Sequence, residues 1–486
     1  MKNFFLHIYI IGSLLLLGGC ACHHKPDAYR EAAPQIYPDY TNVVFPCNIA
    51  PPNFVIKEDG TAYQAEIGYG AAVKMIISND EPTIRIPAKQ WKQLLQEAKG
   101  EDIFFRISVL QGEKWTGYAD IVNRISTHPI DPCLVYRLLY PGYELWNEMG
   151  IYQRDLTSHE QTPVVENRDF GRQCVNCHSF SQHSPENMML HIRGKDGGTL
   201  LYKNGKAEKI NLKPEGFKNG ATYPSWNPDG RYLAFSMNEV QQFFHSAGRK
   251  MVEVSDLESD IVIYDTETNR IFTDSLVYTT AYMETFPTWS PDGENLYFCR
   301  AKAYRKDTSL DSIRYDLYRI RFDKKQERLY DLECVYEASS IGKSVSHPRI
   351  SPNGKYLMFT QSDYGNFSIW HAESDLFLLE LETKQVRALD EVNSNDVDSY
   401  HTWSSSGYWF VFSSKRLDTL WARPFFAAFD PETGRAGKPF LLPQEDPEFY
   451  NTCTYTFNVP ELTTAPIKNQ RQLLDGMRKR AKTVNN

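Results

Sequence analysis

A hairpin that recurs four times constrains the fold of this chain more than any other feature. Its copies are "YPSWNPDGRYLAFSM" from Tyr223, "FPTWSPDGENLYFCR" from Phe286, "HPRISPNGKYLMFTQ" from His347 and "YHTWSSSGYWFVFSS" from Tyr400. Each copy predicts a short strand, a turn in which Gly supplies a positive φ, and a second strand with alternating apolar residues. A period of roughly 60 residues marks a fold made of stacked, similar units.

A second pair of strands follows three of these hairpins. The segments are "DIVIYDTETNRIFTD" from Asp260, "DLYRIRFDKKQERLYD" from Asp316 and "DLFLLELETKQVRALD" from Asp375. A four-stranded antiparallel unit that recurs in this way predicts a β-propeller. We expect Trp226, Trp289 and Trp403 to fill the space between neighbouring blades.

The hairpins resemble the TolB-like family of bacterial envelope β-propellers, whose signature is close to P-x-W-S-P-D-G-x-x-I-A-F. The fourth copy departs from it with "SSSG". The stretch from Cys133 through "CVNCHSFSQ" to "MMLHIRG" is also similar to a group of lipoproteins in gut Bacteroidota, some of which bear a cytochrome c label. These resemblances imply an architecture and a compartment, and no activity.

Both ends of the predicted propeller hold strands without a complete blade. They are "LVYRLLYPGYELW" and "GIYQRDLTSHEQTPVVE" on one side and "NTCTYTFNVPE" on the other. Joining them completes a sixth blade and closes the ring, which removes exposed edges. We therefore predict six blades over residues 129–462, with seven as the main alternative. Cys133 and Cys453 both fall in the closing blade, where a disulfide would staple it.

The remaining regions flank this propeller in an all-β chain. Residues 40–128 alternate as strands and predict a separate β-sandwich, with an immunoglobulin-like topology as one option. One helix, "KQWKQLLQEAKG", interrupts it and places Trp91, Leu94 and Leu95 on one face. The basic segment 463–486 predicts a frayed, solvated tail, and the alternative is a short amphipathic helix that contacts anionic lipid.

The N-terminus predicts export and a lipid anchor. "MKNFFLHIYIIGSLLLLGGCA" has one Lys, an apolar run too short to span a bilayer, and small residues before Cys20. "LLGGC" resembles a lipobox, which implies a signal peptide over residues 1–20, lipidation of Cys20 and a linker over 21–39. Ala21 after the cysteine implies, by resemblance, an outer-membrane location facing the periplasm. The alternative is an ordinary signal peptide with an unmodified Cys20.

Charge restricts the partners. The formal net charge is -8, with acidic and basic residues interspersed along the chain. This pattern argues against a nucleic-acid surface, because such surfaces concentrate positive charge. Besides the membrane, we expect the partner to be an envelope protein or a glycan.

The motif C-x-x-C-H occurs once, at Cys174, Cys177 and His178. By chance it should occur only roughly 0.004 times in a chain of this composition. Two thiols on one helical turn reach the two vinyl groups of haem, and the adjacent imidazole binds the iron. In an exported protein the motif predicts a covalent haem c for electron transfer or redox sensing. A Cys174–Cys177 disulfide, a zinc site and unreacted thiols are the alternatives.

The repeat register places this motif on an innermost strand. His178 aligns with Pro224, Pro287, Pro348 and His401, and Cys177 aligns with His347. His401 and His347 are therefore the first candidates for the sixth iron ligand, with His183 and His191 behind them. Without haem, the chain is expected to be a propeller that binds an envelope partner. We find no G-x-S-x-G, H-E-x-x-H or phosphate-loop motif, and enzyme status stays open.

Overall fold

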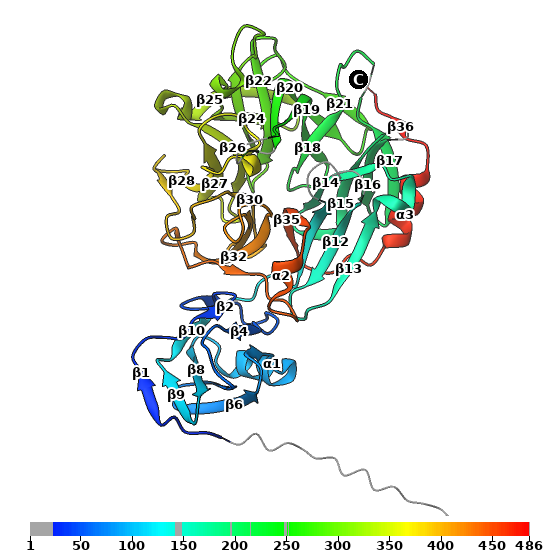
Figure 1. The fold of residues 1–486 in the computed structure, drawn as a ribbon. Coiled ribbons are helices and arrows are strands. Elements are labelled where there is room, and N and C mark those ends of the chain that lie inside the picture. Colours follow the sequence, from blue (N-terminus) through cyan, green and yellow to red (C-terminus); the bar gives the residue numbers. More distant parts are fainter. Residues whose placement is uncertain are drawn as a thin grey trace, which may run out of the picture.

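The computed structural model describes residues 23–140, 148–194, 197–213, 215–246, 250 and 252–485. The predicted signal peptide and Cys20 lie outside these residues. The described chain forms a small N-terminal β domain beside a β-propeller (Figure 1). Among the described helices, none combines the length and apolar character needed to cross a membrane.

The N-terminal domain consists of two sheets and one helix. The seven-stranded sheet contains β1 (Ala28–Arg30), β3 (Val44–Phe45), β5 (Ala62–Tyr69), β6 (Ala72–Asn79), β8 (Asp102–Gln111), β9 (Lys114–Tyr118) and β10 (Ile121–Ile125). The three-stranded sheet contains β2 (Ile36–Tyr37), β4 (Phe54–Ile56) and β7 (Thr83–Ile84). Helix α1 (Ala88–Glu97) buries Trp91, Leu94 and Leu95, as its sequence pattern predicts. Strands β1 and β2 lie in the segment 21–39 that the sequence predicted to be a linker. Their backbones pair with β9 and β4.

The rest of the described chain forms six sheets of at least four strands. The first contains β11 (Cys133–Leu139), β12 (Met149–Asp155), β13 (Gln161–Glu166) and β35 (Thr456–Thr463), and the second contains β14 (Cys174–Ser181), β15 (Ser184–Arg193), β16 (Gly198–Lys203), β17 (Lys206–Asn211) and β36 (Lys482–Thr483). The third contains β18 (Ala221–Trp226), β19 (Tyr232–Phe244), β20 (Val252–Asp265) and β21 (Arg270–Phe272), and the fourth contains β22 (Tyr282–Trp289), β23 (Asn295–Lys302), β24 (Asp316–Asp323) and β25 (Arg328–Tyr336). The fifth contains β26 (Ser344–Ile350), β27 (Tyr356–Ser362), β28 (Asp375–Glu380) and β29 (Val386–Ala388), and the sixth contains β30 (Asp398–Trp403), β31 (Trp409–Ser414), β32 (Arg423–Asp430), β33 (Arg435–Ala436) and β34 (Phe440–Leu441).

The innermost strands of these sheets are β35, β14, β18, β22, β26 and β30, and each contacts the next around a ring. The C-terminal strand β35 closes this ring by pairing antiparallel to β11, from Cys133 opposite Thr463 to Leu139 opposite Thr456. Trp226, Trp289 and Trp403 are buried between the sheets, as predicted. Cys133 and Cys453, whose pairing the sequence left open, are free thiols, so hydrogen bonding and apolar packing close the ring.

The C-terminal segment is ordered, contrary to the predicted frayed tail. Helix α3 (Gln470–Arg478) buries Leu473 and Met477 in the same apolar cluster as Leu200 and Tyr202 of β16, and β36 adds a parallel strand to β17. The apolar side of the helix therefore faces the propeller, and its basic residues face solvent.

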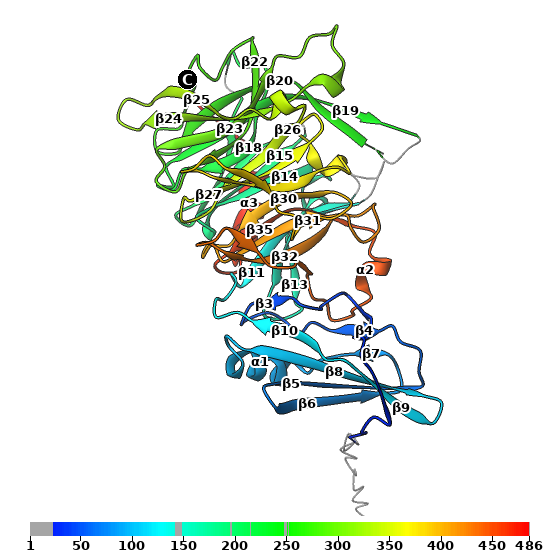
Figure 2. The same cartoon turned by 90° about the vertical axis from the view of Figure 1, so that its left-hand side faces the viewer.

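The two domains share one apolar core (Figure 2). The ring of Phe45 lies 5.2 Å from that of Phe440 in β34. The Tyr40 hydroxyl donates to the Leu441 carbonyl oxygen at 3.4 Å, and Asn53 Nδ2 donates to the Glu445 carbonyl oxygen at 2.9 Å. The N-terminal domain thus packs on the last blade, next to the closure by β35.

Replacing Phe457 tests ring closure. Its side chain is buried in the shared core from the closing strand. We expect Phe457→Ala to lower the free energy of unfolding by about 3–5 kcal/mol, because it leaves a cavity at the joint. Denaturant unfolding followed by tryptophan fluorescence measures this change. The exposed Lys468→Ala is the control, expected to stay within about 0.5 kcal/mol of wild type. Equal stabilities of the two variants would contradict closure by β35.

Candidate functional site

The six innermost strands share one backbone irregularity. Each contains a β-bulge at which a non-glycine residue adopts a positive φ of 48–52°. We call these residues the channel ring: Cys177, Tyr223, Phe286, His347, Tyr400 and Val459. Positive φ is uncommon outside glycine, and bulges redirect side chains. The repeat therefore turns six different side chains toward the centre of the propeller.

The channel ring surrounds a cavity of about 230 Å³. Residues from β11, β15, the β19–β20 hairpin and the loop around Trp370 complete its wall. The cavity lies just below the range of about 300–1,000 Å³ typical of small-molecule sites.

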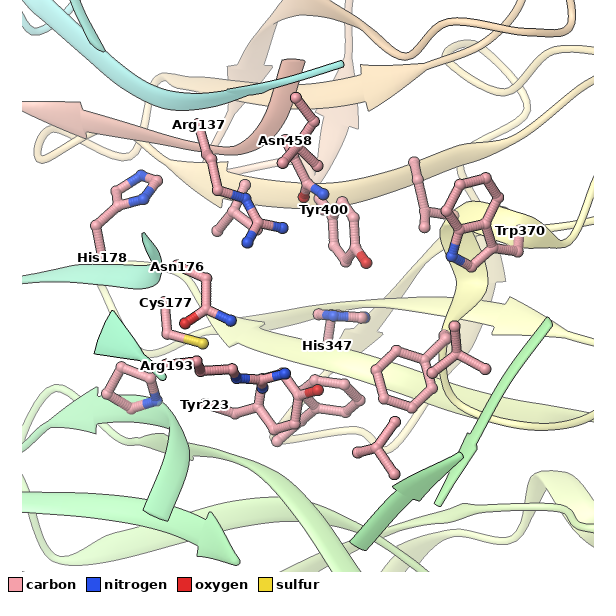
Figure 3. A pocket seen from close by; sticks show the side chains of 18 of the residues that line it. Arg137, Asn176, Cys177, His178, Arg193, Tyr223, His347, Trp370, Tyr400 and Asn458 are labelled. Carbon is pink, nitrogen blue, oxygen red and sulfur yellow. The ribbon is translucent and has the colours of Figure 1, made fainter. Parts of the chain in front are cut away.

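Two arginines reach into this cavity from neighbouring blades. Arg137 comes from β11 and Arg193 from the end of β15, and both side chains extend toward the space in front of Cys177 and Asn176 (Figure 3). Within the described residues neither guanidinium has a carboxylate partner, and Arg137 Nη1 donates to the Val175 carbonyl oxygen at 3.4 Å. Arginine stays charged under all ordinary conditions. The cavity therefore carries positive charge that the described part of the chain does not neutralise.

Other polar atoms at the cavity also lack partners. In the described part of the chain, six buried atoms of the cavity-lining residues make no hydrogen bond: Arg137 Nε, Asn176 Oδ1, His178 Nδ1, His178 Nε2, His347 Nδ1 and Asn458 Oδ1. Buried polar groups are almost always hydrogen-bonded, so each exception needs an explanation. Convergence of such atoms on one cavity is what a site for a polar ligand or ordered water requires.

The opposite wall is aromatic. The ring of Phe286 lies 4.6 Å from that of Tyr223 and 4.0 Å from the imidazole of His347, measured between centroids. Phe367 packs against both Tyr223 and Phe286, and Trp370 stands across the cavity from Cys177 (Figure 3). The site therefore has a cationic side and an aromatic side.

The C-x-x-C-H segment lies on an innermost strand, β14, as the register predicts. Its Cys177 and His178 line the cavity, whereas Cys174 does not and is buried with Leu139 and Met149. Because this segment is a strand, the expected helical turn is absent. A strand rises about 3.3 Å per residue against about 1.5 Å in a helix, so the two cysteines are farther apart along the chain axis than on one helical turn. Both thiols are free. As arranged here, the residues do not fit a haem held through both cysteines, because the Cys174 thiol is buried against Leu139 and Met149 and does not itself line the cavity.

Of the candidate far ligands, His347 alone lines the cavity in the described chain. His401 Nε2 lies 3.0 Å from the Met358 carbonyl oxygen, His183 Nδ1 3.0 Å from the Leu462 carbonyl oxygen, and His191 Nδ1 3.1 Å from Thr199 Oγ1. The described residues contain no group of three or more His, Cys, Asp or Glu arranged to hold a metal. In that part of the chain, Cys174, Cys177 and His178 are thus not joined by a further His, Cys, Asp or Glu in a group that could hold zinc.

The buried histidines are neutral. Burial, reinforced by Arg137, lowers the pKa of His178 to about 3, and burial lowers the pKa of His401 to about 3. Burial also lowers the pKa of His347 well below its ordinary value. The positive charge of the cavity thus comes from arginine and not from imidazolium.

Sequence reasoning identified Cys177, His178 and His347 but missed Arg137, Arg193 and Asn458. The arginines belong to no motif and sit on second strands, away from the recognisable hairpins. The signal that would have revealed Asn458 is its place in "TYTFNVPE", directly before the channel-ring Val459. Asn176 holds the same place before Cys177.

Comparisons with known proteins leave the family open. No family model matches the chain, and no curated protein matches it. Among solved structures, TolB from Acinetobacter baumannii is 14% identical over 73% of this chain and 85% of its own, with a TM-score of 0.40. The Pseudomonas aeruginosa periplasmic gluconolactonase PpgL is 14% identical over 68% of this chain and 100% of its own, with a TM-score of 0.37. Similarities at this level assign no activity. The assignment of a propeller fold rests on the strand pairing of this chain.

The lowered pKa of His178 predicts an acid-dependent loss of stability. Between about pH 6.5 and 3 the unfolded chain binds a proton at this residue that the folded chain does not, so stability falls as pH falls through this window. One such histidine contributes a slope of up to about 1.4 kcal/mol per pH unit. We expect His178→Asn to reduce the slope of unfolding free energy against pH by about this amount. Denaturant titrations between pH 7 and 5 measure it, and parallel curves would contradict a buried, neutral His178.

Proposed function

We propose that this protein is an envelope β-propeller that binds a small anionic ligand in its central cavity. The observation that carries the proposal is the pair Arg137 and Arg193, which face a shared cavity without a carboxylate partner in the described chain. A charged group that is buried away from water is normally paired with an opposite charge. Guanidinium groups bind carboxylate and phosphate through paired, charge-assisted hydrogen bonds.

The composition of the wall supports an anion. Among the described residues that line the cavity there is no Asp or Glu. A third arginine, Arg349, is already paired, since its Nη2 lies 3.0 Å from Glu461 Oε1. Behind the aromatic wall, Asn366 Nδ2 donates to Asp256 Oδ2 at 2.6 Å, and burial raises the pKa of Asp256 to about 7. Asp256 is thus only partly ionised at neutral pH, and it does not line the cavity.

Replacing each arginine tests the proposed site. We expect at least one anion in a panel of small carboxylates and inorganic phosphate to bind the full-length protein, and Arg137→Met or Arg193→Met to weaken it. A hydrogen bond to a charged group contributes about 1.5–3 kcal/mol, which corresponds to about a 10- to 150-fold loss of affinity. Isothermal titration measures this loss. Arg124→Met, an exposed arginine paired with Asp102, is the matched control. A panel without any binder, or equal affinities for all variants, would contradict anion binding.

Covalent haem c at Cys174 and Cys177 is the second candidate. Its support is the C-x-x-C-H spacing in a chain with an export signal, together with Cys177, His178 and His347 on one cavity wall. When bound, haem supplies one-electron redox chemistry. His178 is the neutral imidazole available next to the motif. Attachment through Cys174 requires its thiol to leave the cluster with Leu139 and Met149.

One measurement tests the haem and the lipid anchor together. The protein is made in a bacterial host that matures c-type cytochromes, isolated from the membranes, and its intact mass is determined. If haem is attached, wild type carries its mass through acid extraction, and Cys174→Ala with Cys177→Ala removes that mass and the Soret band. If Cys20 is lipidated, the chain begins at Cys20 with the mass of a lipid, and Cys20→Ser moves the protein to the soluble fraction. A haem-free mass would refute the second candidate, and retention of residues 1–19, or a chain without the mass of a lipid, would refute the anchor.

A further inference from the structure

We propose that the ligand of the central cavity is a small aromatic carboxylate, with its carboxylate between Arg137 and Arg193 and its ring against Tyr223 and Phe286. This inference rests on the proposed anion binding and adds the chemical class of the ligand. It follows from the separation of the wall into two chemically different halves, together with the size of the cavity.

The polar half comes from the first two blades. Arg137 and Asn458 lie on one side of the space, Arg193 on the other, and Asn176 between them beside Cys177 (Figure 3). A carboxylate has two oxygens that accept about four hydrogen bonds. The two guanidinium groups can donate that number, and the buried Nε of Arg137 is one donor without a partner in the described chain.

The aromatic half comes from the third to fifth blades. Tyr223, Phe286 and Phe367 contact one another with centroid distances of 4.6, 6.0 and 6.1 Å. Phe286 and Phe367 belong to a buried apolar cluster against which Tyr223 and Trp370 pack. A planar ring placed here extends the cluster by stacked or edge-to-face contacts. Val254 of β20 adds an aliphatic side chain to the same wall.

Tyr223 joins the two halves. Its ring packs on Phe286, and its phenol lies close enough to Arg193 to influence the pKa of that guanidinium. Burial raises the pKa of Tyr223 well above its ordinary value, so the phenol stays protonated and can donate a hydrogen bond. One side chain thus contacts both the ring and the carboxylate end of such a ligand.

The size and polarity of the cavity favour an aromatic carboxylate over other anions. Its volume of about 230 Å³ lies just below the range of typical small-molecule sites, which favours a compact ligand such as benzoate over a lipid or a nucleotide. A sugar acid of similar size carries hydroxyl groups on all sides. Those facing Phe286 and Phe367 would lose their hydrogen bonds, which is costly.

Ligands that lack either the charge or the aromatic ring test the contributions of the two halves of the wall separately. We expect benzoate to bind at least tenfold more tightly than acetate, which lacks the ring, than benzamide, which lacks the charge, and than cyclohexanecarboxylate, which lacks planarity. Glucuronate is expected to bind more weakly than benzoate. Isothermal titration or ligand-detected NMR on the full chain gives the affinities.

Two variants test which half of the wall binds the carboxylate and which binds the ring. Arg137→Met should weaken benzoate and acetate alike, whereas Phe286→Leu should lower the ratio of benzoate to acetate affinity at least threefold. If Phe286→Leu fails to fold, Phe367→Leu replaces it.

The outcomes distinguish the aromatic ligand class from the proposed anion binding on which it rests. Tighter binding of glucuronate or cyclohexanecarboxylate than of benzoate would overturn the aromatic class and leave anion binding intact. Failure of every anion, acetate included, would overturn the proposed function itself.

Discussion

The positive φ in each innermost strand is the constraint on which the rest of the site depends. A non-glycine residue in this conformation costs about 1–3 kcal/mol, and the chain adopts it six times around one ring. The surrounding strand pairs hold each bulge in place on both sides of the irregular position. The consequence is that residues such as Cys177 and His347 face the centre instead of the space between blades, where their strand neighbours pack.

Closure by β35 gives this ring its geometry. Glu461 of the closing strand accepts from Arg349 of β26 at 3.0 Å and from Thr402 of β30 at 3.2 Å, so one buried carboxylate links three blades. The same strand brings Asn458 opposite Arg137 of β11. The domain contact between Phe45 and Phe440 supports the adjacent blade from outside. Because Arg349 is neutralised by this linkage, Arg137 and Arg193 are the cavity arginines that no carboxylate of the described residues neutralises.

The sequence predicted much of this fold because its signals are local and repeated. The Pro-Asp-Gly turns defined the hairpins, and their register correctly aligned Cys177 with His347. The segments that were predicted wrongly are governed by long-range packing. Strand β1 pairs with β9 far along the chain, and α3 is ordered because Leu473 meets the second blade.

The candidate site was predictable only in part for the same reason. A short motif marked Cys174, Cys177 and His178, but the burial of Cys174 depends on Leu139 and Met149 from the preceding blade. Arg137 and Arg193 look like ordinary strand residues in the sequence. Their role becomes visible only when the ring brings them to one cavity that has no acidic residue in its described wall.

A crystal structure with 4-iodobenzoate tests the central claim most directly, since the iodine marks the position of the ring by anomalous scattering. The account predicts one iodine peak in the cavity on the side of Tyr223, Phe286 and Phe367, with the carboxylate between Arg137 and Arg193. A peak beside the arginines, or a cavity without iodine in crystals that bind it elsewhere, would contradict the division of the cavity into a cationic and an aromatic half.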